Sequence, residues 1–96
     1  MSIEDGRKAA RLAALNALAL AKQHLGSLDK VARVVRMKMS LATTPEFGQH
    51  AKVADGASEL LAEVFGADKA STRSVAGVTS LPLGAPVVVE MILAVA

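Results

Sequence analysis

The stretch Lys30–Leu41, with the sequence KVARVVRMKMSL, alternates between apolar and polar residues. A period of two is typical of a β-strand with one buried face and one exposed face. The stretch therefore predicts a half-buried strand near the middle of the chain. Its apolar side would carry Val31, Val35, Met37, Met39 and Leu41, and its polar side Arg36, Lys38 and Ser40.

A long amphipathic helix is predicted before this strand, over Ile3–Leu25. A pattern resembling a capping box begins at Ser2, and Gly26 is suited to the position that ends a helix. Alanines recur at helical spacing on one side, which allows close packing on a sheet. Leu12 and Leu15 lie nearer the charged side and need a cover that this helix does not supply alone.

A second helix is predicted after the strand. The segment Thr43–Glu46 combines a threonine cap, proline at the first helical position and an acidic first turn. An apolar stripe follows, and Gly66 ends it; Gly48 weakens the start, so the first turn is expected either in this helix or as a separate short one. The stripe consists of Val53, Ala57, Leu60, Leu61 and Val64.

Two further strands are predicted over Thr72–Ser80 and Val87–Val95, joined as a hairpin by the turn cluster Pro82–Pro86. The order helix, strand, helix, strand, strand indicates an α+β fold with two helices on one face of a sheet. It matches a split βαβ, ferredoxin-like unit that lacks its opening strand. An edge left without that strand invites pairing with another chain.

Length and composition narrow the class of protein. Ninety-six residues form one domain, spanning residues 1–96. A hydrophobic content of 52% and a mean hydropathy of +0.39 favour subunit association. Cysteine is absent and only two histidines are present, which argues against a metal site; of these, His50 is expected at the surface. Two phenylalanines and a net charge of +2 argue against a nucleic-acid partner.

No stretch has the pattern of a membrane span. The most apolar candidate, residues 9–25, is interrupted by charged residues and Asn16. Glu4 and Asp5 lie where a signal peptide would be basic. We therefore expect a cytoplasmic protein without a membrane partner.

Glu90 and Arg73 are the residues that most suggest a site. Glu90 interrupts the apolar run Val87–Leu93, where a carboxylate is costly unless it is paired, protonated or turned to solvent. It is therefore either a site acid or a solvent-facing or salt-bridged strand residue. Arg73 opens the preceding strand, and its planar fork suits a carboxylate ligand, although taken by itself the residue fits a surface arginine in a loop better.

Five segments in order carry a resemblance to a known family. The chain resembles the RidA/YjgF family of reactive intermediate deaminases and L-PSP-like endoribonucleases, in its YjgF/chorismate-mutase-like branch. The resemblance covers nearly all of the chain. The segments are AARLAALN at residues 9–16, GSLDKV at 26–31, GASELL at 56–61, RSVAGV at 73–78 and LPLGAPVVVE at 81–90.

The resemblance implies a homotrimer with a chorismate-mutase-like fold and ligand clefts between subunits. It implies hydrolysis of reactive enamines and imines without metal or cofactor. Arg73 matches the arginine that holds the substrate carboxylate, and Glu90 matches the glutamate that positions the attacking water. Val75 matches a cleft residue that is cysteine in RidA, and Asp55 stands where many relatives have asparagine. Members also carry N-terminal strands that precede the first helix, so the chain is expected to be N-terminally truncated.

The leading hypothesis is an imine or enamine deaminase-like protein that hydrolyses or binds small carboxylate-bearing imines. Arg73 and Glu90 are expected to converge in a groove shared by neighbouring strands where subunits meet. One alternative is a non-catalytic trimer that binds a small carboxylate, which the charge of Asp55 favours. Another is an endoribonuclease, which the family label suggests and the low aromatic content disfavours.

Overall fold

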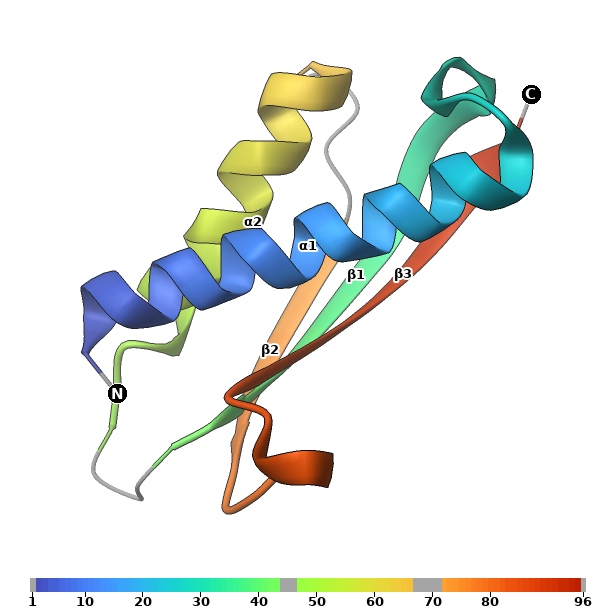
Figure 1. Cartoon of the computed structure of the whole chain (residues 1–96). Helices are drawn as coiled ribbons and strands as arrows, with labels where there is room; N and C mark the ends of the chain where they lie inside the picture. The colour runs from blue at the N-terminus through green and yellow to red at the C-terminus, as the bar shows by residue number, and fades with distance from the viewer. Residues whose placement is uncertain (1, 44–46, 67–71, 96) are drawn as a thin grey trace.

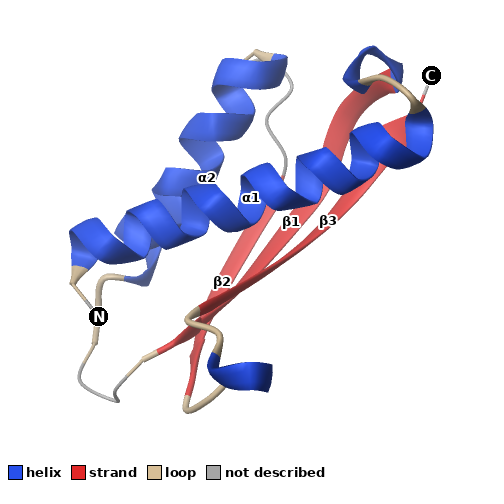
Figure 2. Cartoon of the chain, in the orientation of Figure 1, coloured by secondary structure: helices blue, strands red, loops and turns tan. Residues whose placement is uncertain are grey.

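The computed structural model describes residues 2–43, 47–66 and 72–95. Its three strands and two long helices occur in the predicted order, α-β-α-β-β, which confirms the α+β class (Figures 1 and 2). The elements are α1 (Ile3–Leu25), β1 (Val31–Ala42), α2 (His50–Phe65), β2 (Thr72–Val78) and β3 (Val87–Val95), with short 3₁₀ turns η1 (Leu28–Lys30) and η3 (Pro82–Gly84).

The first helix has the predicted limits. The Ser2 hydroxyl oxygen accepts a hydrogen bond from the backbone N–H of Asp5 at 3.1 Å, which caps the start of α1. At the other end, Gly26 adopts a left-handed φ of 86°, and its N–H donates to the Lys22 carbonyl at 2.7 Å. Local chemistry alone therefore determines where α1 begins and ends.

The second helix begins later than predicted. Residues 44–46 of the expected start lie outside the described residues, and Phe47–Gln49 are not helical. The helix begins at His50, and Gln49 provides no side-chain cap. Gly48, which has a poor helix propensity, separates the expected cap from the apolar stripe and accounts for the later start.

The sheet has the order β2-β1-β3, with β2 parallel and β3 antiparallel to β1. The predicted hairpin between the last two strands is therefore wrong, because β1 lies between them. Residues 79–86 connect these strands, and hairpin loops are usually only about two to five residues long. The end of β1 joins both neighbours through bonds from the Ala42 N–H to the Pro86 carbonyl and from the Thr43 N–H to the Val78 carbonyl, each 3.0 Å.

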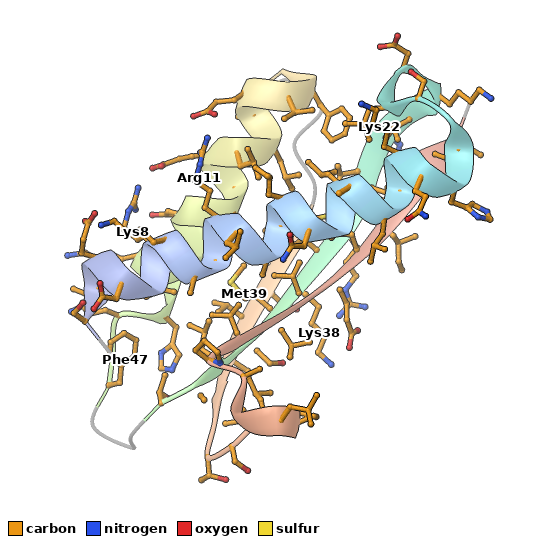
Figure 3. All side chains as sticks on the ribbon, in the orientation of Figure 1. Lys8, Arg11, Lys22, Lys38, Met39 and Phe47 are labelled. Carbon is orange, nitrogen blue, oxygen red and sulfur yellow. The ribbon has the colours of Figure 1, made fainter. Side chains whose placement is uncertain are left out.

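The central strand β1 has one face toward the helices and one open face. Met37 and Met39 are almost fully buried, whereas Lys38 is exposed; Figure 3 shows Met39 beneath α1 and Lys38 away from it. An irregularity in pairing with β3 between Val34 and Arg36 changes the phase of the alternation. Val34, 1% exposed, therefore lies in the core in place of the predicted Val35.

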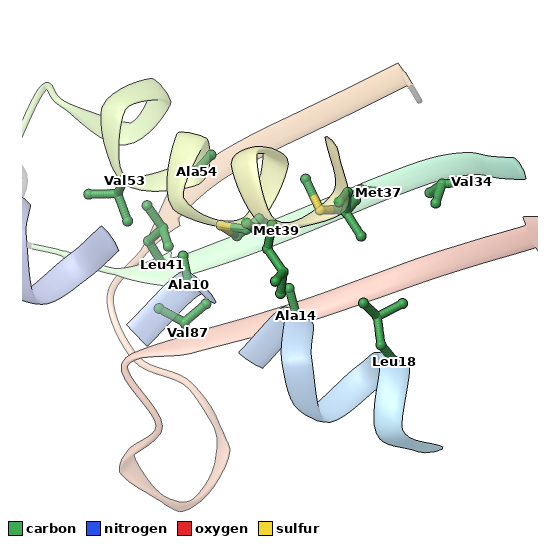
Figure 4. Close-up of a cluster of buried hydrophobic side chains, with 13 residues drawn as sticks. Ala10, Ala14, Leu18, Val34, Met37, Met39, Leu41, Val53, Ala54 and Val87 are labelled. Atoms are coloured by element: carbon green, nitrogen blue, oxygen red, sulfur yellow. The ribbon is translucent and has the colours of Figure 1, made fainter. Parts of the chain in front are cut away.

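The core lies between this face of the sheet and the two helices (Figure 4). The two helices contribute alanines beside leucine and valine, and β1 contributes two methionines, whose flexible side chains fill the space between the layers. The buried cluster consists of Ala10, Ala14, Leu18, Val34, Met37, Met39, Leu41, Val53, Ala54, Ala57, Leu60, Leu61 and Val87.

The two helices cross where Gly56 lies against the backbone of Arg7. A Cβ atom at position 56 would collide with the Arg7 carbonyl. Ion pairs continue along the crossing, with Arg7 Nη2 2.6 Å from Glu59 Oε2 and Arg11 Nη2 2.9 Å from Glu63 Oε2. The hydrogen bond from Arg11 lowers the pKa of Glu63. Backbone proximity and charge pairing together fix α2 against α1.

Considerable apolar surface stays uncovered. Leu12 and Leu15 on the outer side of α1 are 59% and 47% exposed, which confirms that α1 alone does not cover them, and Leu20 is 67% exposed. The accessible surface of the chain is 5829 Å², whereas scaling with mass gives roughly 5,200 Å² for a compact monomer of this size. In the part of the chain that the structure describes, neither α1 nor α2 has the combination of length and hydropathy that a transmembrane helix requires.

Gly56→Ala is expected to lower the free energy of unfolding by about 1–3 kcal/mol, because α1 must move away from the new methyl group. This range is the net change, after the better helix propensity of alanine has returned about 1 kcal/mol. Gly48→Ala is the matched control, since no atom lies within 4 Å of the added Cβ. Urea unfolding followed by circular dichroism measures both. A Gly56→Ala protein as stable as the control would contradict the close crossing.

Candidate functional site

Arg73 lies near the start of β2, on the helix side of the sheet. It is paired with Met37 of β1, and paired residues project from the same face. Arg73 Nη1 donates to Asp55 Oδ1 at 2.8 Å and to Ser58 Oγ at 3.0 Å. Both partners belong to α2, where a spacing of three residues places them on one side of the helix. The α2 helix therefore orients the guanidinium of Arg73.

The guanidinium of Arg73 is only partly committed to these contacts. Both bonds use Nη1, so Nη2 and Nε have no partner among the described residues. The side chains of Arg73 and Asp55 are 28% and 44% exposed, respectively, and an ion pair this accessible contributes about 1 kcal/mol or less to stability. Arg73 therefore retains donors for a ligand, beside a carboxylate that already balances its charge.

Val75 shares this face of the sheet with Arg73. It is paired with Met39, is half-buried and packs against the buried cluster. Three of the predicted site residues, Asp55, Arg73 and Val75, thus lie on the helix side. At position 75 the strand offers backbone groups and an apolar side chain, and no thiol.

Glu90 lies on the other face of the sheet. It is exposed and is paired with Lys38 across β1 and β3. With Arg36, Lys38 and Ile92 it lines an open hollow of about 160 Å³. Within the described part of the chain, no hydrogen bond or ion pair engages its carboxylate. The Glu90 carboxylate therefore has no bonded partner among the described residues, and the basic side chains of Arg36 and Lys38 lie beside it.

The expected convergence of Arg73 and Glu90 does not occur within one chain. Arg73 is paired with Met37 and Glu90 with Lys38, and consecutive residues of a strand project to opposite faces. The two residues also lie on strands separated by β1. The error follows from the assumed hairpin, which would have made their strands neighbours. Any site that uses both residues needs more than one copy of the chain.

The sequence did not predict that Arg36 and Lys38 lie beside Glu90, or that Ser58 contacts Arg73. The alternation in β1 predicts only a solvated face for Arg36 and Lys38, because a strand's own pattern does not specify what it pairs with. Ser58 shows no signal beyond a helical position. The clearest available clue was Asp55, whose three-residue spacing from Ser58 places two acceptors on one side of the predicted second helix.

His50 is half-buried, contrary to the expected surface position. Its ring meets Phe47 edge-on, with ring centroids 5.2 Å apart, and a Cβ atom at position 77 would collide with its Nε2. Gly77 therefore leaves the room that the imidazole occupies. Residues 2–43, 47–66 and 72–95 contain no group of three histidine or carboxylate side chains arranged to hold a metal ion.

Comparison with known proteins identifies the family to which the chain is related. The model of the family "YjgF/chorismate_mutase-like, putative endoribonuclease" matches residues 1–95. The Trypanosoma cruzi protein TCP17 is 37% identical over 91 residues, which cover 94% of this chain and 57% of that protein.

Two solved structures share the fold. A protein of unknown function from Agrobacterium tumefaciens is 35% identical, with a TM-score of 0.96 over 100% of this chain and 62% of its own. A putative endoribonuclease from Shewanella oneidensis is 32% identical, with a TM-score of 0.92 over 97% of this chain and 62% of its own. The chain thus spans about three fifths of the length of these relatives. It belongs to the YjgF/chorismate mutase-like family.

Proposed function

We propose that this protein is a Rid-type imine or enamine deaminase of the cytoplasm that needs no cofactor. In this proposal it binds small carboxylate-bearing imines where copies of the chain meet. Arg73 of one copy holds the ligand's carboxylate through Nη2 and Nε, and Glu90 of another copy positions a water. The observation that carries the proposal is that α2 orients the Arg73 guanidinium through Nη1 alone, which leaves Nη2 and Nε without a partner among the described residues.

The proposed reaction is a hydrolysis. The water oxygen bonds to the imine carbon while the C=N electron pair moves to nitrogen, which takes up a proton. The resulting carbinolamine then loses ammonia and forms the carbonyl product. The Glu90 carboxylate would accept the proton from water and return it to nitrogen. Such acid–base help supplies about 10²–10⁴-fold, which suits an imine that is already electrophilic.

The proposed assembly is a homotrimer, supported by the uncovered sheet face and the excess accessible surface. Association would cover part of the apolar surface and bring Glu90 of one copy toward Arg73 of another. Val75 would line the cleft beside Arg73, through its backbone and its apolar side chain.

Light scattering on the 96-residue protein is expected to give a mass of about 30 kDa, because three chains of 9.9 kDa associate. A dilution series provides the control for non-specific association, which would give a continuous drift of mass with concentration. A constant mass of one chain would contradict the shared site.

Arg73→Ala and Glu90→Gln are each expected to reduce imine hydrolysis at least about 10²-fold, because one loses the carboxylate anchor and the other the base. The assay follows ammonia released from a 2-aminoacrylate-type imine generated in situ. Arg33→Ala is the matched control, since Arg33 is an exposed residue of β1. Full turnover by Arg73→Ala protein, with the fold verified by circular dichroism, would overturn the proposal.

A second candidate is a non-catalytic trimer that binds a small carboxylate. One observation favours it: Glu90 lies on the sheet face opposite Arg73, and binding alone does not require Glu90. A non-catalytic trimer should release or absorb heat when pyruvate is added in a calorimeter, and the Arg73→Ala protein should not. The native protein should not accelerate imine hydrolysis. Acceleration by the native protein would exclude it.

Endoribonuclease activity is the third candidate, and it is favoured by the family's description and by the similarity to the putative endoribonuclease from Shewanella oneidensis. Two phenylalanines and a net charge of +2 offer little for stacking or phosphate contacts. Cleavage of single-stranded RNA by the purified protein, lost in Arg73→Ala, would place this activity first.

A further inference from the structure

The Asp55 carboxylate occupies the position at which an external carboxylate would meet Arg73. Asp55 Oδ1 lies 2.8 Å from Arg73 Nη1, and Ser58 Oγ adds a second contact to the same nitrogen at 3.0 Å. A guanidinium binds a carboxylate through two parallel N–H groups. Because Nη1 is occupied, the edge formed by Nη1 and Nη2 is closed to a bidentate ligand, and the edge formed by Nε and Nη2 stays open.

The charge near this open edge is set by Asp55. The Arg73–Asp55 pair is neutral as a whole, and the exposed fractions of 28% and 44% leave its field only partly screened by water. Arg7 also lies within electrostatic reach of Asp55. Its pKa is raised mainly by its hydrogen bond with Glu59 and in smaller part by Asp55. Glu59 is the ion-pair partner of Arg7, whereas the ion-pair partner of Asp55 is Arg73.

We infer that Asp55 is a specificity-determining residue that makes Arg73 select ligands with one carboxylate over dicarboxylates. A second carboxylate would meet the negative charge of Asp55. This inference rests on the proposed function and names the substrate class of that same site.

Asp55→Asn tests the inference, because asparagine retains an oxygen that accepts from Arg73 and removes only the charge. Titration calorimetry compares two probes, pyruvate with one carboxylate and 2-oxoglutarate with two. We expect Asp55→Asn to raise the affinity for 2-oxoglutarate about tenfold or more, and to raise that for pyruvate less. Asp29→Asn, at an exposed aspartate in η1, is the matched control and should leave both affinities unchanged.

A second measurement needs no variant and so does not depend on folding of Asp55→Asn. In the native protein, the preference for pyruvate over 2-oxoglutarate should narrow as salt rises from about 0.05 to 0.5 M, because exposed charges are screened. An unchanged ratio of affinities in Asp55→Asn and in high salt, with binding still lost in Arg73→Ala, would overturn the inference and leave the proposed function intact. Binding that survives Arg73→Ala would overturn the proposed function and this inference with it.

Discussion

The central strand fixes the relation between the two faces of this molecule. Met37 and Lys38 are consecutive residues of β1, and a β-strand projects consecutive side chains to opposite sides. Arg73 is paired with the first and Glu90 with the second. A shift of either register by one residue would move one of these charged groups to the other face. The position of every candidate site residue on the sheet thus depends on the pairing of β1 with its two neighbours.

The helices make the two faces chemically different. Small residues allow α1 and α2 to cover one face closely, with Gly56 against the Arg7 carbonyl at their crossing. That layer also supplies Asp55 and Ser58, which hold Arg73. The other face has no covering layer among the described residues and carries Arg36, Lys38 and Glu90. The fold therefore builds one oriented, charge-balanced arginine and one free acid, and a single copy keeps them apart.

The sequence predicts elements well where local chemistry determines them. The limits of α1 and β3 are those expected, because the capping serine, Gly26 and the turn before Val87 act within a few residues. Features that depend on distant partners were not predictable. The irregularity that buries Val34 in place of Val35 arises from the pairing of β1 with β3. The hairpin prediction was wrong because β1 pairs with both β2 and β3 and so lies between them. For the same reason, residue types and family resemblance single out Arg73 and Glu90, but not the faces on which they lie.

Reconstitution of mixed assemblies measures most directly whether Arg73 and Glu90 act from different copies. Arg73→Ala and Glu90→Gln chains, each inactive alone, would be unfolded, mixed in equal amounts and refolded before imine hydrolysis is assayed. If each site takes one residue from each of two copies, random assembly gives about a quarter of the sites both native side chains, and about a quarter of the native activity returns. If the mixture stays as inactive as its components although the chains have exchanged, the two residues do not act across copies.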